Sequence, residues 1–230
     1  MIVDIHNHIL PGIDDGAKTV KESVDLIRGF SEMGITNLVA TPHIMSNLYP
    51  NTKETISASM DFLTNEMVSN DLKDISIEAA AEHMIDENFE ELLERGGVMP
   101  MRKQYLLVEM SYLQASINFD NATQSIMKKG FFPILAHPER YGYWHTNKSK
   151  YSAYKKKGIQ YQLNILSLSD YYGPEVHNVA LNLLDHGLFD YIATDIHRTE
   201  QIDYLKEIQI KASLLDGVIP LINNTINTFY

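Results

Sequence analysis

The sequence predicts an α/β fold, a distorted TIM-like (β/α)₇ barrel formed as a single domain by the whole chain, residues 1–230. Strand-like and helix-like patterns alternate about seven times, and such alternation implies parallel strands joined by right-handed crossovers. No linker, low-complexity run or internal repeat interrupts the alternation. Seven units in 230 residues suit a compact barrel better than a full eight-unit barrel. An open doubly wound sheet is the alternative, and both folds place functional groups at the carboxyl ends of their strands.

Seven short stretches rich in apolar and β-branched residues, bounded by glycine, proline or Asx residues, have the pattern of strands. The first opens the chain with Val3, Ile5 and Ile9, and the turn residues Pro11-Gly12 and Asp14-Asp15-Gly16 follow it. The other six strands are expected over residues 36–43, 75–82, 105–109, 132–137, 161–165 and 190–197.

Helical patterns separate these strands. Between the first two strands, Val20, Val24 and Ile27 repeat at helical spacing and a glycine marks the stop, which predicts a helix over 19–33. Further helices are expected over residues 52–72, 88–95, 118–129, 148–157, 174–186 and 201–215. The sequence assigns no element to residues 217–230.

Composition and charge exclude several classes of function. The chain has no cysteine, so it has no disulfide, thiolate zinc site or cysteine nucleophile. Its 19 basic and 30 acidic residues give a net charge of −11, which disfavours nucleic-acid binding because that needs a basic surface. No apolar run reaches the roughly 18 residues that span a bilayer, and the first residues lack the pattern of a signal peptide. We therefore expect a cytoplasmic protein without membrane insertion and without a nucleic-acid partner; the oligomeric state is unknown.

His6 and His8, near the end of the first strand, have the spacing of a metal site. Side chains two residues apart in a strand project from the same face, roughly 6.6 Å apart along it. Two imidazoles so placed can converge on one ion at about 2.0–2.1 Å from each nitrogen. The alternative is that one histidine faces the core and binds a backbone carbonyl. Asp195-Ile196-His197 repeats the same spacing at the end of the last strand.

Ligand-type side chains stand at or just past the ends of six strands. They are His6, His8, Asp15, His43, Glu82, Glu109, His137, Asp195 and His197. Because these nine are imidazoles and carboxylates only, they suit manganese, zinc or iron rather than a soft metal. Nine ligands suit two or three ions, and paired ions stabilise the attacking and leaving oxygens of a displacement at phosphorus. A water shared between two such ions ionises near neutral pH and provides a nucleophile.

Other polar residues near this set are candidates for further roles. Arg140, in His137-Pro-Glu-Arg140, and Arg198, directly after His197, are candidate phosphate ligands, because a guanidinium binds two phosphate oxygens in its fixed fork. The alternative for each arginine is a salt bridge with a surface acid. His43 is a candidate catalytic side chain as well as a ligand. We assign surface or structural roles to the remaining histidines, His83, His145, His177 and His186.

Five motifs resemble those of the polymerase-and-histidinol-phosphatase (PHP) superfamily. They are DIHNHILPGIDDGA (4–17), ATPH (40–43), LVE (107–109), LAHPER (135–140) and ATDIH (193–197). Within the superfamily, they resemble the bacterial metal-dependent protein tyrosine phosphatases of capsule and exopolysaccharide operons, the CpsB/CapC type. The resemblance runs from about residue 3 to about residue 198 in the same order and spacing. A single H-x-H is a weak signal, whereas the full set of motifs is specific.

The resemblance implies a distorted (β/α)₇ barrel of the PHP fold, a manganese centre and a phosphotyrosine tail on a bacterial tyrosine kinase as substrate. Zinc or iron is the alternative metal. By position, the first ion would be held by His6, His8, Glu82 and Asp195. Glu82 would bridge to a second ion held with Glu109 and His137, and a third would be held by Asp15, His43 and His197. Arg140 matches the phosphate-contacting arginine of the family.

Two positions depart from the pattern of the family. Glu82 follows three alanines where some relatives have a glycine before the glutamate, which leaves Glu78 as an alternative ligand. Arg198 follows the Asp-x-His motif at once, whereas the second arginine of the family often comes several residues later. The aromatic run 141–144 suggests either stacking on a phosphotyrosine ring or packing on the next helix.

These observations together give a functional hypothesis. The chain would hydrolyse phosphotyrosine in a protein through a metal-activated hydroxide, without a covalent intermediate, and so control capsule or exopolysaccharide synthesis. One alternative is another PHP phosphoesterase, acting on histidinol phosphate or a nucleotide. The other is a catalytically inactive metal-binding module that docks a kinase tail. The acidic composition argues against DNA as substrate, and the complete ligand set argues against an inactive module.

Overall fold

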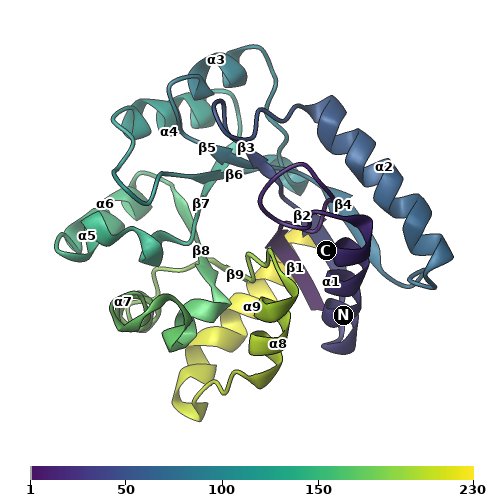
Figure 1. Cartoon of the computed structure of the whole chain (residues 1–230). Helices are drawn as coiled ribbons and strands as arrows, with labels where there is room; N and C mark the ends of the chain where they lie inside the picture. Colours follow the sequence, from purple (N-terminus) through teal and green to yellow (C-terminus); the bar gives the residue numbers. More distant parts are fainter. Residues whose placement is uncertain (1) are drawn as a thin grey trace.

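The computed structural model describes residues 2–230, in which strands and helices alternate along the chain (Figure 1). The strands are β1 Ile2–Asn7, β2 Ile35–Ala40, β3 His43–Ile44, β4 Ser76–Ala79, β5 Glu82–Met84, β6 Tyr105–Glu109, β7 Phe132–Ala136, β8 Gln160–Asn164 and β9 Tyr191–Ala193. The α-helices are α1 Val20–Glu32, α2 Lys53–Ser69, α3 Phe89–Glu94, α4 Phe119–Lys128, α5 Gly142–His145, α6 Ser149–Lys156, α7 Pro174–Asp185, α8 Thr199–Glu207 and α9 Leu215–Phe229. Short 3₁₀ helices are η1 Arg102–Gln104, η2 Pro138–Arg140, η3 Ile165–Leu168, η4 Asp170–Tyr172 and η5 Ala212–Leu214.

The strands form two parallel sheets, in the orders β1-β2-β4 and β3-β5-β6-β7-β8-β9. The chain passes from the first sheet to the second twice, between β2 and β3 and again between β4 and β5. At the other side, β1 meets the segment after β9, where the N–H of Asp195 donates to the carbonyl of His6 (2.7 Å) and that of His8 to Ile196 (2.8 Å). The predicted α/β class with parallel strands is therefore confirmed.

Two of the seven expected strands are interrupted, so the described residues contain nine strands. The expected strand 36–43 breaks at Thr41-Pro42, because proline has no N–H to continue the ladder. The expected strand 75–82 breaks at Ala80-Ala81, where the N–H of Ala81 donates to the carbonyl of Met99 rather than to a strand. Both breaks lie directly before ligand-type residues, and both move the chain from one sheet to the other.

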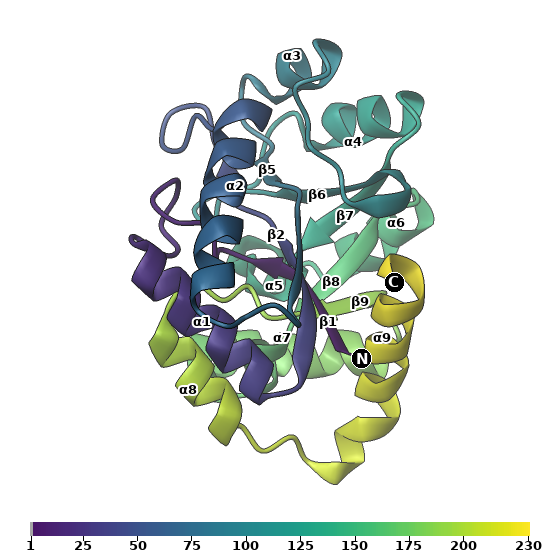
Figure 2. The same ribbon diagram turned by 90° about the vertical axis from the view of Figure 1, so that its right-hand side faces the viewer.

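Most expected helices form close to their predicted bounds, but the last one does not. The helix expected over 201–215 ends at Glu207, and a second helix, α9, covers most of the tail that the sequence left unassigned. Figure 2 shows α9 beside β1 and β9. Its buried side chains Val218, Leu221 and Phe229 lie on one helical face, so packing against the sheets stabilises it.

Apolar side chains fill the space between the strands and the space under the helices. An inner cluster contains Val3 and Ile5 from β1, Leu107 from β6 and Ile134 from β7, together with Phe229 from α9. Strands of both sheets therefore share one core. Among the described residues, no helix is long and apolar enough to cross a lipid bilayer.

Candidate metal centre

The structure brings all nine predicted ligand residues together at the carboxyl ends of the strands. Their side-chain atoms form three groups in which every ligand atom lies within 4.8 Å of the others. The groups are His6, His8, Glu82 and Asp195; His8, Asp15, His43 and His197; and His43, Glu82 and Glu109. His137 joins them through its Nε2, which lies 3.2 Å from Oε1 of Glu82. Glu78, the alternative to Glu82, lies outside the cluster and pairs with Arg102.

The first group is completely enclosed by protein. Nε2 of His6 lies 3.2 Å from both Oε2 of Glu82 and Oδ1 of Asp195. Nε2 of His8 lies 3.3 Å from the same Asp195 oxygen and 3.6 Å from the same Glu82 oxygen. Among the described residues, neither of these two carboxylate oxygens has a hydrogen-bond partner. Buried polar atoms without partners are costly, so atoms that point at a common centre fit a set of metal ligands.

His43 lies between the other two groups. Its Nε2 is 3.3 Å from Oδ1 of Asp15, and its Nδ1 is 2.9 Å from Oε1 of Glu109 and 3.1 Å from Oε2 of Glu82. The ligand set that the resemblance implies places this histidine with Asp15 and His197, and the structure adds Glu82 and Glu109 as neighbours.

Hydrogen bonds fix the orientation of three of the histidines. His6 donates through Nδ1 to Oε1 of Gln162 (2.9 Å), and His8 donates through Nδ1 to Oδ2 of Asp14 (2.8 Å). His197 donates through Nδ1 to the backbone carbonyl of Asp195 (2.9 Å). In each case Nε2 is left facing the cluster, where it can bind a cation when the imidazole is neutral. Metal-binding histidines are typically held by such partners, which set the tautomer and raise the basicity of the ligating nitrogen.

Sequence reasoning missed Asp14 and Gln162 as parts of the site. Asp14 could have been found from the acidic turn after the first strand, where only Asp15 was selected. Its Oδ1 accepts from the N–H of Gly16 (2.9 Å) and its Oδ2 from that of His43 (3.1 Å). For Gln162 the signal was its place in the strand, since Gln162 and Asn164 are polar residues that share one face near the carboxyl end, where the predicted ligands of the other strands also lie.

The backbone is strained at two of the ligand residues. His137, at the end of β7, has a φ of 35°, and Asp195, after β9, has a φ of 54°. Residues with a side chain rarely adopt this left-handed region, at a cost of order 1–3 kcal/mol each, and such residues gather at functional sites. Gly16 has a steric role, since a Cβ built on it would overlap the backbone and Cβ of His8.

Charge complementarity stabilises the cluster internally. Burial alone would raise the pKa of Glu82 and of Asp195, but the neighbouring imidazole of His6 lowers the pKa of both carboxyls well below the usual value. Conversely, burial would lower the pKa of His6, but Glu82 and Asp195 raise it well above the usual value. The carboxylates are therefore ionised at neutral pH, as metal ligands must be.

Arg140 lies at the edge of the cluster, and its guanidinium packs against the rings of two tyrosines. Its Nη1 donates to Oδ2 of Asp195 (2.6 Å), and its guanidinium lies 4.6 Å from the ring centre of Tyr112 and 4.1 Å from that of Tyr172. The hydroxyl of Tyr112 is 3.2 Å from Nε2 of His137. Sequence reasoning missed both tyrosines, and the signal for Tyr112 was its place three residues after Glu109 at a strand end. Arg198 is exposed at the start of α8.

The aromatic run 141–144 packs in the core. Tyr141 and Trp144 are buried, and Trp144 stacks on Tyr154 of α6 with ring centres 5.2 Å apart. Of the two alternatives for this run, packing on the next helix is therefore the one that the structure shows. The four remaining histidines contact backbone carbonyls; for example, Nδ1 of the buried His83 donates to the carbonyl of Leu107.

Comparisons with known proteins give a consistent family. The family model for capsular polysaccharide synthesis proteins CpsB/CapC matches residues 2–207. The chain is 26% identical over 199 residues to the tyrosine-protein phosphatase YwqE of Bacillus subtilis (strain 168), covering 86% of this chain and 78% of that protein. It is 27% identical over 197 residues to the putative tyrosine-protein phosphatase CapC of Staphylococcus aureus, covering 85% and 77%.

Solved structures agree with these relatives. One crystal structure, from a study of YwqE from Bacillus subtilis and CpsB from Streptococcus pneumoniae described as unique metal-dependent tyrosine phosphatases, aligns with a TM-score of 0.80. That alignment has 25% identity and covers 97% of this chain and 95% of the other. A lactonase from Listeria monocytogenes, with a TM-score of 0.57 and 11% identity over 100% of this chain and 94% of the other, shares the fold alone. The match to the family model spans most of the chain, and the chain belongs to the CpsB/CapC family.

Proposed function

We propose that this chain is a metal-dependent protein tyrosine phosphatase, which hydrolyses the phosphate monoester of phosphotyrosine in a protein. The observation that carries the proposal is the largely buried cluster of nine imidazoles and carboxylates with Arg140 at its edge. The phosphatase names of the relatives and the metal dependence of the matching structure support it.

We assign the nine residues of the cluster as ligands of two or three divalent ions, with manganese as the metal that suits them best and zinc or iron as alternatives. Bound ions would supply an ionised water as nucleophile and would neutralise charge on the phosphate oxygens. The support for this assignment is a set of carboxylate oxygens that have no hydrogen-bond partner among the described residues and include atoms of Glu82, Glu109 and Asp195.

The chain's own side chains orient the phosphate. The planar fork of Arg140 binds two phosphate oxygens, and its stacking between Tyr112 and Tyr172 fixes the plane of the fork. The tyrosine phenolate has a pKa near 10 and leaves with modest help from a general acid. We further assign His43 a catalytic role in addition to its role as a ligand, and Arg198 the role of a second phosphate contact. With no cysteine in the chain, no thiol-linked phosphoenzyme forms.

The proposal extends to the architecture and the cellular setting. We propose that residues 1–230 act as one domain and that the two sheets together form a distorted (β/α)₇ barrel, which the core shared by strands of both sheets supports. We also propose a cytoplasmic location and, as substrate, a phosphotyrosine tail of a bacterial tyrosine kinase that controls capsule synthesis. The family's link to capsular polysaccharide synthesis supports this setting.

A substrate comparison tests the proposal. Purified protein with added Mn²⁺ is incubated with a phosphotyrosine peptide, histidinol phosphate or single-stranded DNA, each with and without a chelator. We expect phosphate release from the peptide that the chelator abolishes. Preferential hydrolysis of histidinol phosphate or DNA would assign the chain to another phosphoesterase activity, and no release with a metal-loaded protein would assign it a non-catalytic role.

A further inference from the structure

A groove of about 570 Å³ has a lining that begins two residues after three of the proposed ligand residues. Its walls are the loops that follow β3, β5 and β6, the strands that carry His43, Glu82 and Glu109. The lining residues are 45–48, 84–87, 111 and 114–118. Each loop enters the groove two residues after a ligand residue, so the groove and the metal centre share one rim.

The loops around this groove expose large apolar side chains to water. Leu48 is 69% exposed on the loop after β3, and Leu113 and Ile117 are 93% and 101% exposed on the loop after β6. Apolar side chains that gather beside a polar centre, rather than being scattered singly, indicate a binding surface.

Hydrogen bonds between the loops hold the groove in shape. The hydroxyl of Ser116 donates to the backbone carbonyl of Ile85 (2.6 Å), and the side-chain amide of Asn118 donates to the backbone carbonyl of Asp86 (3.3 Å). The carboxylate of Asp86 accepts from the N–H of Ser46 (2.9 Å). The three walls are therefore tied to one another, and a ligand would bind with little loss of loop freedom.

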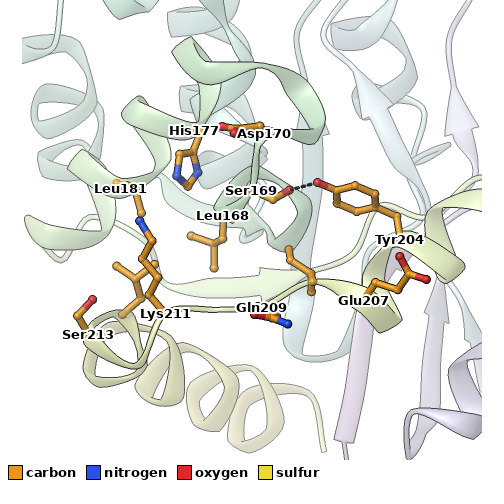
Figure 3. Close-up of a pocket in the computed structure, with 12 residues that line it drawn as sticks. Leu168, Ser169, Asp170, His177, Leu181, Tyr204, Glu207, Gln209, Lys211 and Ser213 are labelled. Atoms are coloured by element: carbon orange, nitrogen blue, oxygen red, sulfur yellow. Dashed lines mark hydrogen bonds between the residues drawn. The ribbon is translucent and has the colours of Figure 1, made fainter.

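A second pocket has a volume of about 590 Å³. Figure 3 shows it between α7 and the segment after α8, with a hydrogen bond of 3.2 Å from the hydroxyl of Tyr204 to Ser169 on one side. Its charged lining is mixed, with Asp170, Glu207 and Lys211. None of its lining residues belongs to the ligand set.

We propose that the groove lined by the loops after β3, β5 and β6 binds the polypeptide that flanks the phosphotyrosine, and that it takes an apolar side chain within about three residues of that tyrosine. The inference rests on the proposed function. A peptide whose phosphate reaches the metal centre must lay its neighbouring residues over the shared rim, at about 3.3 Å per residue in an extended chain.

The charge of the groove narrows the choice of side chain. Asp86 and Glu87 line it, and it has no basic side chain among its lining residues. An acidic residue next to the phosphotyrosine would therefore meet like charge, whereas a leucine or another apolar residue would cover exposed apolar surface. The groove thus gives the enzyme a sequence preference beyond the phosphate itself.

A set of phosphotyrosine peptides tests the inference. Each peptide carries a single leucine at one position, from three residues before to three residues after the tyrosine, in a background of alanine and serine. Each is compared with its aspartate counterpart and with p-nitrophenyl phosphate, which has no flanking residues. We expect kcat/KM to be about tenfold higher for leucine than for aspartate in at least one position. Equal values at every position would overturn the proposal.

Variants of exposed groove residues test whether the groove causes the preference for an apolar side chain. In the double variant Leu48→Ser, Ile117→Ser, the ratio of kcat/KM for the best leucine peptide to that for p-nitrophenyl phosphate should fall about tenfold. The matched control is Phe62→Ser on α2, an exposed aromatic that does not line the groove, which should keep the wild-type ratio. An unchanged ratio in the double variant overturns the groove assignment. If wild-type protein with bound metal hydrolyses no phosphotyrosine substrate at all, the proposed function fails instead.

Discussion

His8 shows how one ligand side chain depends on residues that touch no metal. Its Nδ1 donates to Asp14, and burial would raise the pKa of Asp14, but His8 lowers it to about 2. The carboxylate therefore stays charged at neutral pH. Asp14 also accepts the backbone N–H groups of Gly16 and His43, so it positions two histidines and the turn between them.

This arrangement predicts a metal-binding defect for Asp14→Asn. The amide keeps the shape of the side chain but loses the charge that orients His8 and raises its basicity. We expect the affinity for Mn²⁺ to fall about 10- to 100-fold, as loss of such a partner typically does. Calorimetric titration of the chelator-treated protein measures it, with Asp25→Asn on the exposed side of α1 as control. Equal affinities in the two variants would show that Asp14 is not needed for the site.

Arg140→Lys separates the planar fork from the charge. Lysine keeps a cation near Asp195 but cannot bind two phosphate oxygens in a plane or stack between Tyr112 and Tyr172. We expect kcat for a phosphotyrosine peptide to fall about 100-fold, the loss typical of a missing transition-state donor. Metal per chain, measured by elemental analysis, should stay at the wild-type value. Loss of metal together with activity would contradict the phosphate role.

At the residue scale, the sequence predicted the side chains that face the candidate metal centre but not the side chains that orient them. Histidine and carboxylate pairs at strand ends are visible in the chain because the period of a strand fixes which side chains share a face. Gln162 and Tyr172 are far from His6 and Arg140 in sequence, and only the folded chain brings each pair together. No local pattern encodes such contacts.

At the scale of elements, helix α9 illustrates the same limit. The sequence from Gly217 onward contains Pro220, which argues against a helix, yet the tertiary contacts of one helical face override local propensity. The helix expected over 201–215 is wrong in its second half. α8 ends at Glu207, because the chain then leads to the face of the sheets on which α9 packs, and α9 begins only at Leu215.

Phe229→Ala tests how much α9 contributes to stability. Phe229 is buried between strands of both sheets and has Tyr105 and Tyr191 within 5.3 Å of its ring centre. Truncation leaves a cavity, and we expect the free energy of unfolding in urea to fall by about 3–5 kcal/mol. Ile219→Ala, at an exposed position of the same helix, should cost less than about 0.5 kcal/mol. Similar losses for both would mean that α9 does not close the core.

For the whole molecule, the strand order matters because it concentrates charge. Strands β5 and β6 and the segments after β1 and β9 bring four carboxyl side chains to one place, Glu82, Glu109, Asp15 and Asp195, in a chain whose net charge is already −11. Without bound cations, Arg140 and protonated histidines balance this charge. The pKa of His43 illustrates it: burial would lower the pKa, but Glu109, Asp15 and Glu82 raise it well above the usual value.

The stability of the metal-free protein should therefore fall as the pH rises. His6 and His43 have a pKa well above 6.5 in the folded chain, so the fold holds protons that the unfolded chain releases. Their stabilising contribution is full below about pH 6.5 and is lost as the pH rises through the higher folded pKa values. Bound Mn²⁺ replaces those protons, and since ligand histidines must be neutral, its affinity increases with pH.

Thermal unfolding between pH 6 and pH 9, with a chelator and with excess Mn²⁺, measures both effects. We expect Tm with the chelator to decrease across this range, and the gain in Tm from Mn²⁺ to widen steadily toward pH 9. The variant His6→Gln, His43→Gln removes the two titrating imidazoles, so its chelated form should lose most of the slope. Parallel curves with and without metal in the wild-type protein would mean that the histidines do not exchange protons for cations, and the assignment of the cluster as a metal centre would fall with them.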